Sequence, residues 1–310
     1  MTARSSQSQV LGLVFGGDSA EREVSLRTGA AVAGALDRAG VDYQSFDGAR
    51  AVVDAARDGR IGRVLNMIHG RGGEDGCLQG ALALYGVPVS GSGLLASALT
   101  MDKLQTKRVW RAAGIPTPDW RIARAAADAA AIEADLGLPV FVKPAREGSS
   151  VGMSRIVERG RLSDAVARAL EYDECVLVER LVEGPEYTAA VLEREVLPLV
   201  RIATPRDFYD YDAKYNAGDT EYRAPCGLEP AREQALRALA LQAFDVLGCR
   251  GWGRVDFLLD TEGEPWLLEV NTVPGLTDHS LVPMAAAAAG IDFDRLVMRV
   301  LATTGEGSAQ

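Results

Sequence analysis

The chain has 310 residues, of which 47% are hydrophobic and 25% are charged, with 33 lysines and arginines against 43 aspartates and glutamates. This composition is typical of a soluble globular protein, and the length suffices for two or three packed units. A net charge of −10 and scattered basic residues argue against a nucleic-acid partner or an anionic membrane surface.

The cysteines lie far apart and form no C-x-x-C pair, which argues against both a zinc site and a disulfide framework. They are Cys77, Cys175, Cys226 and Cys249. The polar start of the chain and the short apolar run Val10–Phe15 do not match a signal peptide. No window approaches the ~18 apolar residues of a membrane span. We therefore expect a protein of the reducing cytoplasm.

The first third of the chain alternates apolar runs with glycine-containing loops. Strands are predicted over Val10–Phe15, Val64–Ile68 and Val87–Val89, and a helical segment follows the first loop and ends near Gly40. Strand, loop and helix repeated in this way are typical of an open α/β sheet, whose ligands bind beyond the carboxyl ends of the strands. The three loops carry Glu21, His69 and Ser90.

A dinucleotide-binding fold is one alternative for such a start, but no G-x-G-x-x-G follows the first strand. Glu21 has a structural alternative as a helix cap, and His69 has one as a hydrogen-bonded structural histidine. Neither residue alone establishes a binding site.

Two longer helices are predicted, one over Leu94–Ala113 and one from about Ala231 to Leu247. The first contains Met101-Asp-Lys103 and is followed by the proline-rich segment Gly114–Pro118. Because prolines and glycines interrupt regular structure, we expect a domain boundary at this segment.

The strand Leu138–Lys143 ends in a lysine and leads into a glycine- and serine-rich loop, Arg146–Met153. Such a loop exposes backbone N–H groups and hydroxyls that can surround phosphate oxygens, which predicts a phosphate clamp with Lys143 at its base. It is not a Walker loop, because G-x-x-x-x-G-K-[ST] is absent. An ordinary hairpin turn is the structural alternative.

The next strand, Cys175–Glu179, continues into an extended acidic connection that reaches Glu186. Such a segment can offer backbone groups to a purine edge and carboxylates to ribose hydroxyls. Two strands are predicted around Glu193-Arg-Glu195. The segment Phe208–Asn216 mixes aromatic and polar side chains without periodicity, so we predict a lid loop that covers phosphates with Lys214.

The most informative stretch is Gly251–Thr277, where two short β-prone runs flank a turn with glycine and proline. This pattern predicts an antiparallel hairpin. If Leu259 faces Trp266, Asp256 lies directly opposite Glu269, with Cβ atoms ~4.5–5.5 Å apart.

Two carboxylates directly opposite each other repel unless positive charge lies between them. Mg²⁺ suits this position, because it takes oxygen ligands from one or two carboxylates and completes its shell with water and phosphates. Asn271 shares the face two residues past Glu269, and Arg254 lies two residues before Asp256. A solvated hairpin face is the alternative, but a metal site beside a guanidinium suits charge developing on a phosphoryl or acyl group.

Taken together and in this order, the motifs resemble those of the bacterial D-alanine–D-alanine ligases of the ATP-grasp superfamily, from about Val10 to Leu301. The matching segments are Gly17–Ser25, His69–Gly76, Met101–Lys103, Lys143–Gly152, Phe208–Tyr215, Gly251–Asp256 and Glu269–Thr277.

The resemblance implies a mixed α/β (α+β) architecture, the ATP-grasp fold preceded by an N-terminal open α/β domain. The expected domains are an N-terminal substrate domain over residues 1–100, a central ATP-grasp subdomain over 101–185, and a C-terminal subdomain with the metal site and the lid over 186–310.

The reaction implied by the resemblance is ADP-forming and has two steps. ATP phosphorylates the carboxylate of one D-alanine, and the amine of a second D-alanine then attacks the acyl phosphate. The product, D-alanyl-D-alanine, serves peptidoglycan precursor synthesis. The resemblance implies ATP and two Mg²⁺ as cofactors, with Mn²⁺ as a substitute, D-alanine as the substrate, and a cytoplasmic homodimer.

The resemblance also assigns roles to single residues. Asp256, Glu269 and Asn271 match the metal ligands. The nucleotide-binding set is Lys103, Lys143, Ser149, Glu179, Val182, Glu186 and Lys214. The substrate-binding set is Glu21, His69, Gly275, Ser280 and Leu281, and the catalytic set is Glu21, Ser149, Tyr215 and Arg254.

Within these sets, Glu21 is implied to hold the ammonium of the first D-alanine, hydrogen-bonded to Ser149 and Tyr215 on the other domains. Arg254 and a backbone N–H near Gly275 are implied to stabilise the tetrahedral oxyanion. Ser280 and Leu281 match positions that bind the carboxylate of the second D-alanine.

Two alternatives remain after the resemblance. One is an ATP-grasp ligase with a different second substrate, D-lactate or D-serine; Tyr215 favours the dipeptide, since ester-forming relatives typically have phenylalanine there. Arg180 departs from the lysine expected beside the adenine. The other alternative is a non-catalytic relative, which would have lost Arg254 or a metal ligand, whereas all the expected charged positions are present.

Overall fold

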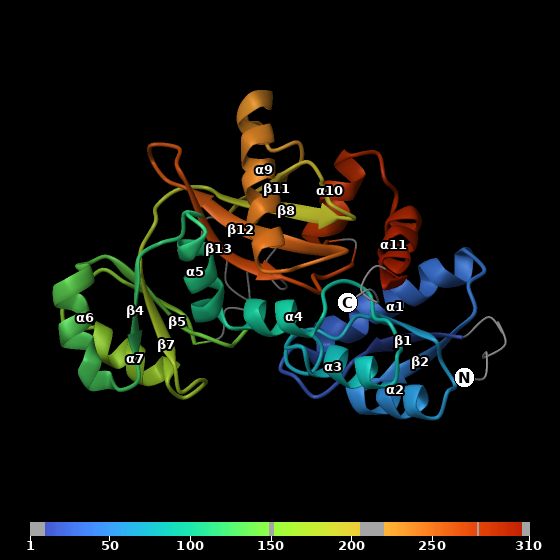
Figure 1. Cartoon of the computed structure of the whole chain (residues 1–310). Helices are drawn as coiled ribbons and strands as arrows, with labels where there is room; N and C mark the ends of the chain where they lie inside the picture. Colours follow the sequence, from blue (N-terminus) through green and yellow to red (C-terminus); the bar gives the residue numbers. More distant parts are fainter. Residues whose placement is uncertain (1–9, 149–151, 205–219, 278, 306–310) are drawn as a thin grey trace.

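The computed structural model describes residues 10–148, 152–204, 220–277 and 279–305. Three β-sheets organise this part of the chain, one parallel and two antiparallel. Figure 1 shows the parallel sheet (blue) and the four-stranded sheet (green) at opposite ends of the molecule, with the six-stranded sheet (yellow to orange) above and between them. Helices α4 and α5 lie along the middle and join the two ends.

The N-terminal unit is a parallel sheet with strand order β2-β1-β3, flanked by helices. Its elements are β1 (Leu11–Phe15), α1 (Arg22–Arg38), β2 (Tyr43–Asp47), α2 (Gly48–Arg57), β3 (Arg63–Asn66) and α3 (Cys77–Leu84). The predicted strands over Val10–Phe15 and Val64–Ile68 and the first helix are confirmed. The edge strand β2 was not predicted, because its five residues contain no apolar run and mostly face solvent.

The predicted third strand, Val87–Val89, is wrong as a strand and forms only an isolated parallel bridge between Val64 and Val89. Pro88 explains the interruption, since proline has no N–H to donate to a ladder. The backbone on either side still bonds to Val64: Val64 N donates to Pro88 O at 2.8 Å, and Ser90 N donates to Val64 O at 2.9 Å.

The central unit is an antiparallel sheet with strand order β4-β7-β5-β6, covered by helices α6 and α7. Its elements are α4 (Leu94–Met101), α5 (Lys103–Ala112), β4 (Trp120–Ala123), the 3₁₀ turn η1 (Ala126–Asp128), α6 (Ala129–Leu136), β5 (Val140–Pro144), β6 (Ser154–Ile156), α7 (Leu162–Ala169) and β7 (Val176–Arg180). The predicted strands that end at Lys143 and Glu179 are confirmed as β5 and β7.

The prediction of a single helix over Leu94–Ala113 is wrong, because the helix is interrupted at Asp102. This residue has an extended backbone conformation, and its carboxylate accepts a hydrogen bond from Gln105 N at 3.0 Å. Aspartate is a favourable N-cap, so it ends α4 and starts α5 in a new direction. Lys103 is therefore the first residue of α5.

The C-terminal unit is an antiparallel sheet with order β11-β10-β8-β12-β13, to which β9 adds beside β8. Its elements are β8 (Glu186–Leu192), β9 (Glu195–Val196), β10 (Val200–Ala203), β11 (Glu221–Arg223), α9 (Pro230–Val246), β12 (Trp252–Leu259), β13 (Pro265–Asn271), α10 (Leu281–Ala288), α11 (Phe293–Ala302) and the 3₁₀ turn η2 (Thr303–Gly305). The predicted strands around Glu193 and the helix from about Ala231 to Leu247 are confirmed.

The β12–β13 hairpin has the predicted pairing at its functional end and a different one at its turn. Asp256 pairs with Glu269, as predicted, but Leu259 pairs with Pro265 rather than with Trp266. A β-bulge after Asp256 accounts for the difference, because β13 contributes one extra residue between the two ends of the ladder.

One buried cluster joins the first and last parts of the chain. It contains Leu13 of β1, Leu36 of α1, Trp252 of β12, and Val282 and Leu296 of α10 and α11. Helix α1 packs against α11, so the parallel sheet shares its core with the end of the chain. The three sheets fall within residues 1–100, 101–185 and 186–310, and this division into domains stays a prediction.

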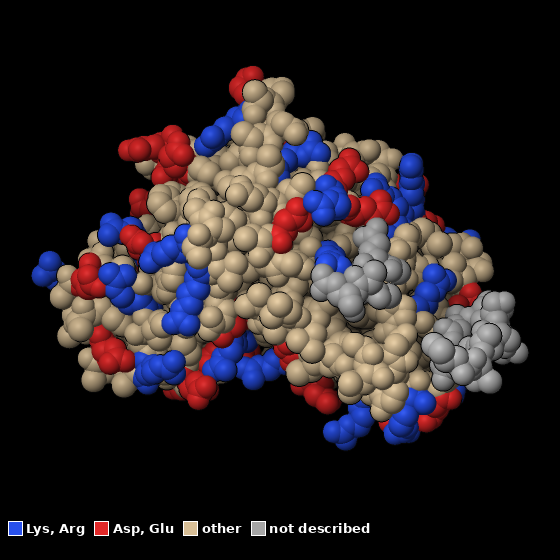
Figure 2. All heavy atoms as spheres, in the orientation of Figure 1, with Lys and Arg blue, Asp and Glu red and all other residues tan. Residues whose placement is uncertain are grey.

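The surface is a mixture of charges. Figure 2 shows Lys and Arg interspersed with Asp and Glu over the face drawn, and many of these side chains pair with one another. Exposed ion pairs contribute at most about 1 kcal/mol each, so stability depends on the buried clusters. Within the described ranges, no helix has the length and apolar character needed to cross a membrane.

The packing of α1 on β1 generates a first prediction. A Cβ at Gly29 would lie 2.3 Å from Cγ of Phe15, whereas one at Gly34 would meet only the flexible end of Arg38 at 3.3 Å. We expect Gly29→Ala to lower the Tm by several degrees, since overpacking costs about 1–3 kcal/mol. Gly34→Ala should raise the Tm, because alanine is favoured in helices by up to about 1 kcal/mol. Calorimetry of both variants checks that the two changes in Tm have opposite signs. A higher Tm for Gly29→Ala than for the wild type would contradict the packing.

Candidate active site

Asp256 and Glu269 face each other on β12 and β13, and each carboxylate has a cationic partner, one from the same strand and one from α5. Arg254 holds Asp256 through three hydrogen bonds, from Nε to Oδ1 at 2.8 Å and to Oδ2 at 3.2 Å, and from Nη2 to Oδ2 at 2.7 Å. Lys103 Nζ, at the start of α5, lies 3.3 Å from Glu269 Oε2. The two cations offset the repulsion that the predicted pairing creates.

Neighbouring polar groups complete the surroundings of Asp256, which is almost fully buried. Thr188 Oγ1 on β8 donates to Oδ1 at 2.6 Å, and Asn271 Nδ2 donates to Oδ2 at 3.1 Å. A buried carboxylate is costly unless it is paired and hydrogen-bonded, and here it is both.

This donor set fits a hard divalent cation. Asp256, Glu269 and the amide of Asn271 supply oxygen atoms from one hairpin face, and Mg²⁺ prefers one or two carboxylates with remaining positions left for water and phosphate. The described residues contain no cluster of three or more His, Cys, Asp and Glu side chains suited to a metal, so a metal here relies on the amide as well. The assignment of the three ligands stays a prediction.

A cavity of about 1400 Å³ opens above this hairpin face and extends between α1 and α10. Loops from all three units reach it. The predicted site residues that line it are Glu21, His69, Lys103, Arg254, Glu269, Asn271, Gly275, Ser280 and Leu281. Residues that are distant in the sequence and were singled out separately therefore share one cavity.

Glu21 lies at the N-terminus of α1 but does not act as a helix cap through its side chain. Its carboxylate fits between two glycines from different loops. A Cβ at Gly70 would lie 2.8 Å from Oε2, and one at Gly148 would lie 3.0 Å from Oε1. The capping alternative is thus not the structural role of this side chain, which faces the cavity.

His69 is buried and links the N-terminal and C-terminal units. Its Nδ1 lies 2.8 Å from the carbonyl oxygen of Val273, which can only accept, so Nδ1 carries the proton. Nε2 then accepts from the hydroxyl of Thr28 at 3.0 Å. Burial lowers the pKa of His69 and so favours the neutral ring, although the negative charge of Glu21 acts to raise this pKa. The substrate-binding role of His69 stays a prediction, and these contacts give the side chain a structural role.

Gly275, Ser280 and Leu281 form one wall of the cavity, at the start of α10. Ser280 Oγ accepts from Thr277 N at 3.0 Å, and a Cβ at Gly275 would lie 2.9 Å from this oxygen. A side chain at position 275 would therefore displace the Ser280 hydroxyl from this contact. The unpaired N–H groups and dipole at a helix N-terminus suit a carboxylate, as predicted for the second amino acid.

The predicted nucleotide residues Lys143 and Glu179 belong to a separate buried cluster on β5 and β7. Lys143 Nζ lies 2.6 Å from Glu179 Oε2, and Lys107 Nζ of α5 lies 2.8 Å from Oε1. Lys107 also donates to Thr117 Oγ1 at 2.5 Å, and the Thr117 hydroxyl donates in turn to the carbonyl oxygen of Leu267. Burial lowers the pKa of Lys107 to about 8.

Lys107 was missed in the sequence, although a signal for it exists. Lys103 and Lys107 are four residues apart, and side chains at this spacing lie on the same face of a helix. The motif Met101-Asp-Lys103 contains only the first of the two lysines.

Comparison with known proteins decides the family. Residues 109–302 match the family model described as D-ala D-ala ligase C-terminus. The chain belongs to the D-alanine–D-alanine ligase family. It is 54% identical over 289 residues to D-alanine–D-alanine ligase of Stutzerimonas stutzeri (strain A1501), covering 93% of this chain and 92% of the relative. It is 53% identical over 292 residues to the enzyme of Methylococcus capsulatus, covering 94% of each.

Solved structures of the family have the same fold. D-alanine–D-alanine ligase from Bacillus anthracis complexed with ATP is similar with a TM-score of 0.84 and 30% identity, over 97% of this chain and 99% of that one. VanG D-Ala:D-Ser ligase from Enterococcus faecalis is similar with a TM-score of 0.84 and 29% identity, over 96% and 100%. The predicted ATP-grasp fold is confirmed.

The other predicted site residues lie on β7–β8 or outside the described ranges. Val182 is in the connection after β7, and Glu186 is the half-buried first residue of β8. Ser149, Lys214 and Tyr215 lie outside the described residues. Their roles, including the lid and the link from Glu21 to Ser149 and Tyr215, therefore stay predictions.

Glu74 is a second residue that the motif search missed, although it lies within the matched His69–Gly76 segment. It lines the same cavity as Glu21 and Arg254, and its Oε2 accepts from Gly70 N at 2.9 Å. Burial, together with the negative charge of Glu21, raises the pKa of Glu74 well above its usual range. Glu74 therefore adds an acid that favours its neutral form to the wall of the cavity.

The lysine cluster generates a second prediction. Burial acts to raise the pKa of Glu179, but the charges of Lys107 and Lys143 outweigh it and hold this pKa below its ordinary value. Glu179→Gln should destabilise the protein by about 3–5 kcal/mol at neutral pH, because it leaves two buried ammonium groups without a counter-charge.

The same shift fixes the direction of the pH dependence. The stabilisation from Glu179 is complete above the ordinary pKa of a glutamate and is lost as the pH falls through the lower folded value. We therefore expect the Tm of the wild type to fall more steeply below about pH 4.5 than that of Glu179→Gln. Glu174→Gln, at a carboxylate that is 78% exposed, is the control and should change neither quantity. Equal slopes for the wild type and Glu179→Gln would contradict the assignment.

Proposed function

We propose that the chain catalyses the ATP-dependent ligation of two D-alanines to D-alanyl-D-alanine, with ADP and phosphate as the other products. The observation that carries this proposal is the shared cavity, in which Glu21, Lys103, Arg254 and Glu269 converge from three units of a chain that belongs to this family. The cavity thus brings the Glu21 carboxylate, two cations and the hairpin for which we propose a metal to one place.

In the first step, the γ-phosphoryl group of ATP passes to a carboxylate oxygen of the first D-alanine, which forms an acyl phosphate and releases ADP. Glu21 would hold the ammonium of this D-alanine, and the positive charges of Lys103 and Lys143 would offset the phosphate charge. Positioning and charge neutralisation account for most of the catalysis of phosphoryl transfer.

In the second step, the neutral amine of the second D-alanine attacks the acyl carbon. The new C–N bond forms, the bond to phosphate breaks, and the proton lost by the amine leaves with solvent or phosphate. Arg254, which lines the cavity and is only 15% exposed, would stabilise the oxyanion together with the N–H at Gly275. The N-terminus of α10 would orient the second substrate through its carboxylate.

We propose Mg²⁺, with Mn²⁺ as a substitute, at Asp256, Glu269 and Asn271. A bound divalent cation supplies charge neutralisation for the phosphates. With a divalent metal ion bound at Asp256 and Glu269, the side chains of Arg254 and Lys103 would no longer neutralise these two carboxylates. Both cations would then be available to the reacting groups.

The identity of the second substrate is the point at which relatives differ. The similar structures include a D-Ala:D-Ser ligase, and its TM-score equals that of the D-alanine–D-alanine ligase bound to ATP. The fold therefore does not distinguish the two second substrates, whereas the 54% and 53% identical relatives are both D-alanine–D-alanine ligases. We propose D-alanine on the strength of these relatives.

We also propose a homodimer that works in the cytoplasm and supplies the dipeptide for peptidoglycan precursors. Three leucines on the adjacent helices α3 and α4 support a protein partner. Leu84, Leu94 and Leu95 are 85%, 54% and 68% exposed, and contact with a second subunit would remove this apolar surface from water.

A substrate panel tests the proposed reaction. Phosphate release and products identified by mass should show D-alanyl-D-alanine from ATP, Mg²⁺ and D-alanine, and no dipeptide from L-alanine. D-serine or D-lactate offered with D-alanine should give less mixed product than D-alanyl-D-alanine. If the mixed product exceeds D-alanyl-D-alanine at neutral pH, the second substrate is D-serine or D-lactate rather than D-alanine. Absence of any ligation product would overturn the proposal.

Arg254→Ala tests the oxyanion role. We expect kcat to fall about 10²- to 10³-fold, since removal of one oxyanion donor has this effect in other enzymes. Arg108→Ala, at an exposed position of α5, is the matched control and should leave kcat unchanged. The Tm of both variants excludes unfolding, and a kcat for Arg254→Ala within tenfold of the wild type would remove Arg254 from the catalytic set.

A further inference from the structure

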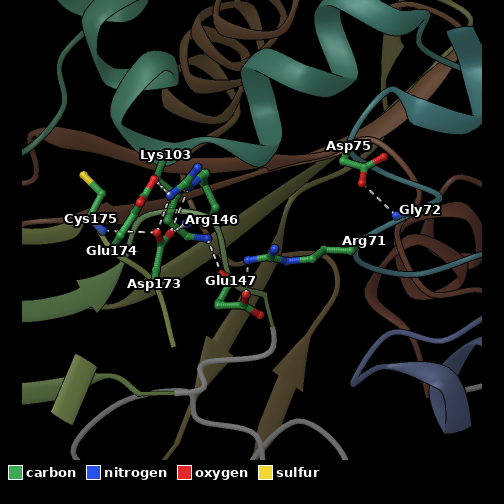
Figure 3. A network of polar contacts seen from close by, with 9 residues as sticks. All are labelled: Arg71, Gly72, Asp75, Lys103, Arg146, Glu147, Asp173, Glu174 and Cys175. Carbon is green, nitrogen blue, oxygen red and sulfur yellow. Dashed lines mark hydrogen bonds and ion pairs between the residues drawn. The ribbon is translucent and has the colours of Figure 1, made fainter. Parts of the chain in front are cut away.

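Two loops from different units meet beside Glu21. One follows β3 and covers residues 69–76, and the other follows β5 and is described up to residue 148. Arg71 Nη2 in the first loop donates to Glu147 Oε1 in the second at 2.5 Å. Figure 3 shows the two side chains extending toward each other across the space between the loops.

The second loop is firmly attached to the central unit on the side away from Arg71. Arg146 binds Asp173 through Nη2 at 2.6 Å and through its backbone N at 2.8 Å, and the Asp173 side chain is 1% exposed. Lys103 Nζ donates to the backbone oxygen of Glu147 at 2.7 Å. Arg146 and Lys103 therefore fix the backbone of this loop, and the side chain of Glu147 is left to reach the N-terminal unit (Figure 3).

The first loop is held equally well within the N-terminal unit. Gly72 N donates to Asp75 Oδ2 at 2.8 Å, Gly70 N donates to Glu74 Oε2 at 2.9 Å, and Asn66 Nδ2 donates to the carbonyl oxygen of Gly73 at 2.9 Å. The backbone at Arg71 is thus preorganised, so the ion pair orders few additional groups when it forms.

The contact bears on the substrate site through Glu21. The Glu21 carboxylate lies between Gly70, which precedes Arg71, and Gly148, which follows Glu147. The ion pair therefore joins the two loops at the residues adjacent to those that enclose Glu21. Lys103, which binds the Glu147 backbone, also lies 3.3 Å from Glu269 on the hairpin.

We propose that Arg71 and Glu147 are positioning residues whose ion pair holds the loop of the nucleotide-binding unit against the subsite of the first D-alanine. Binding of the amino acid at Glu21 and binding of the nucleotide beside Lys103 both favour the joined loops, so each ligand strengthens the binding of the other. This inference rests on the proposed function and adds a coupling contact to it.

The exposure of the pair sets the expected size of the effect. The Arg71 side chain is 59% exposed and that of Glu147 is 22% exposed. Ion pairs of this kind are modest, and their loss corresponds to about a twofold to fivefold change in an equilibrium constant. Coupling between two ligands is reciprocal, so it can be measured from either side.

Calorimetric titration with Mg²⁺ and the non-hydrolysable analogue AMP-PNP, with and without saturating D-alanine, measures the coupling as a ratio of Kd values. For the wild type we expect tighter AMP-PNP binding in the presence of D-alanine. Arg71→Met and Glu147→Gln should each reduce this ratio about twofold to fivefold, and the double variant should behave like either single variant. The reversed pair, Arg71→Glu with Glu147→Arg, should restore part of the ratio.

Arg38→Met is the matched control. Arg38 pairs with Asp294 of α11 at 2.6 Å, so this pair also joins two units, and Arg38 is 59% exposed like Arg71. It lies at the far end of α1, about 25 Å from Glu21 at 1.5 Å per residue. Arg38→Met should match the Tm of Arg71→Met and leave the coupling ratio unchanged. A wild-type ratio of one, additive effects in the double variant, or an equal effect of Arg38→Met would overturn the inference.

The outcome is distinguishable from a failure of the proposed function. The coupling is read from binding of AMP-PNP and D-alanine without turnover, whereas the proposed function is read from dipeptide formation. If the wild type forms the dipeptide but Arg71→Met leaves the coupling ratio unchanged, the inference alone is refuted. A wild type that binds both ligands but forms no dipeptide refutes the function alone.

Discussion

The opposition of Asp256 and Glu269 across one hairpin is the constraint on which the rest of the site depends. Two carboxylates at this spacing require positive charge, and the fold supplies it from two directions. Arg254 comes from the same strand as Asp256, and Lys103 comes from the start of α5. The break at Asp102 is what places Lys103 there, so a local capping preference determines a long-range charge balance. The cavity forms where these charges meet the loops of the N-terminal unit.

Buried contacts join the N-terminal and C-terminal units beside this site. Buried side chains of α1, β1 and α11 share a core, and His69 bonds to the backbone of Val273. The central unit joins the C-terminal unit through a second buried cluster, in which Trp110 and Ile115 pack with Phe244, and it reaches the cavity through the Arg71–Glu147 pair and the contact of Lys103 with Glu269. At the cavity itself the central unit contributes polar contacts, which are weaker than a shared apolar core. Under the proposed function, such contacts suit loops that admit and release a ligand.

Much of the fold and of the candidate site was predictable, and the failures have physical reasons. Two β-prone runs on either side of a turn predicted the hairpin. The assumed pairing of Leu259 with Trp266 is wrong, but the pairing of Asp256 with Glu269 that followed from it is present. The two runs did not predict the bulge, since one extra residue in a strand leaves no compositional signal. The helix pattern continued through Asp102 because one polar residue does not interrupt an apolar period. Lys107 and Glu74 went unnoticed because the burial of a charged side chain depends on partners from distant strands and loops.

The cluster of Lys107, Lys143 and Glu179 has a consequence for the catalytic cycle. Two buried ammonium groups share one carboxylate, so among the described residues of this cluster one positive charge has no counter-charge. An uncompensated buried charge raises the free energy of the protein that holds it. Under the proposed function, the polyphosphate of an arriving nucleotide would bring negative charge to this cluster, and its departure would restore the imbalance. The empty protein would then be the form of higher free energy, and nucleotide exchange would belong to the charge balance of the folded chain.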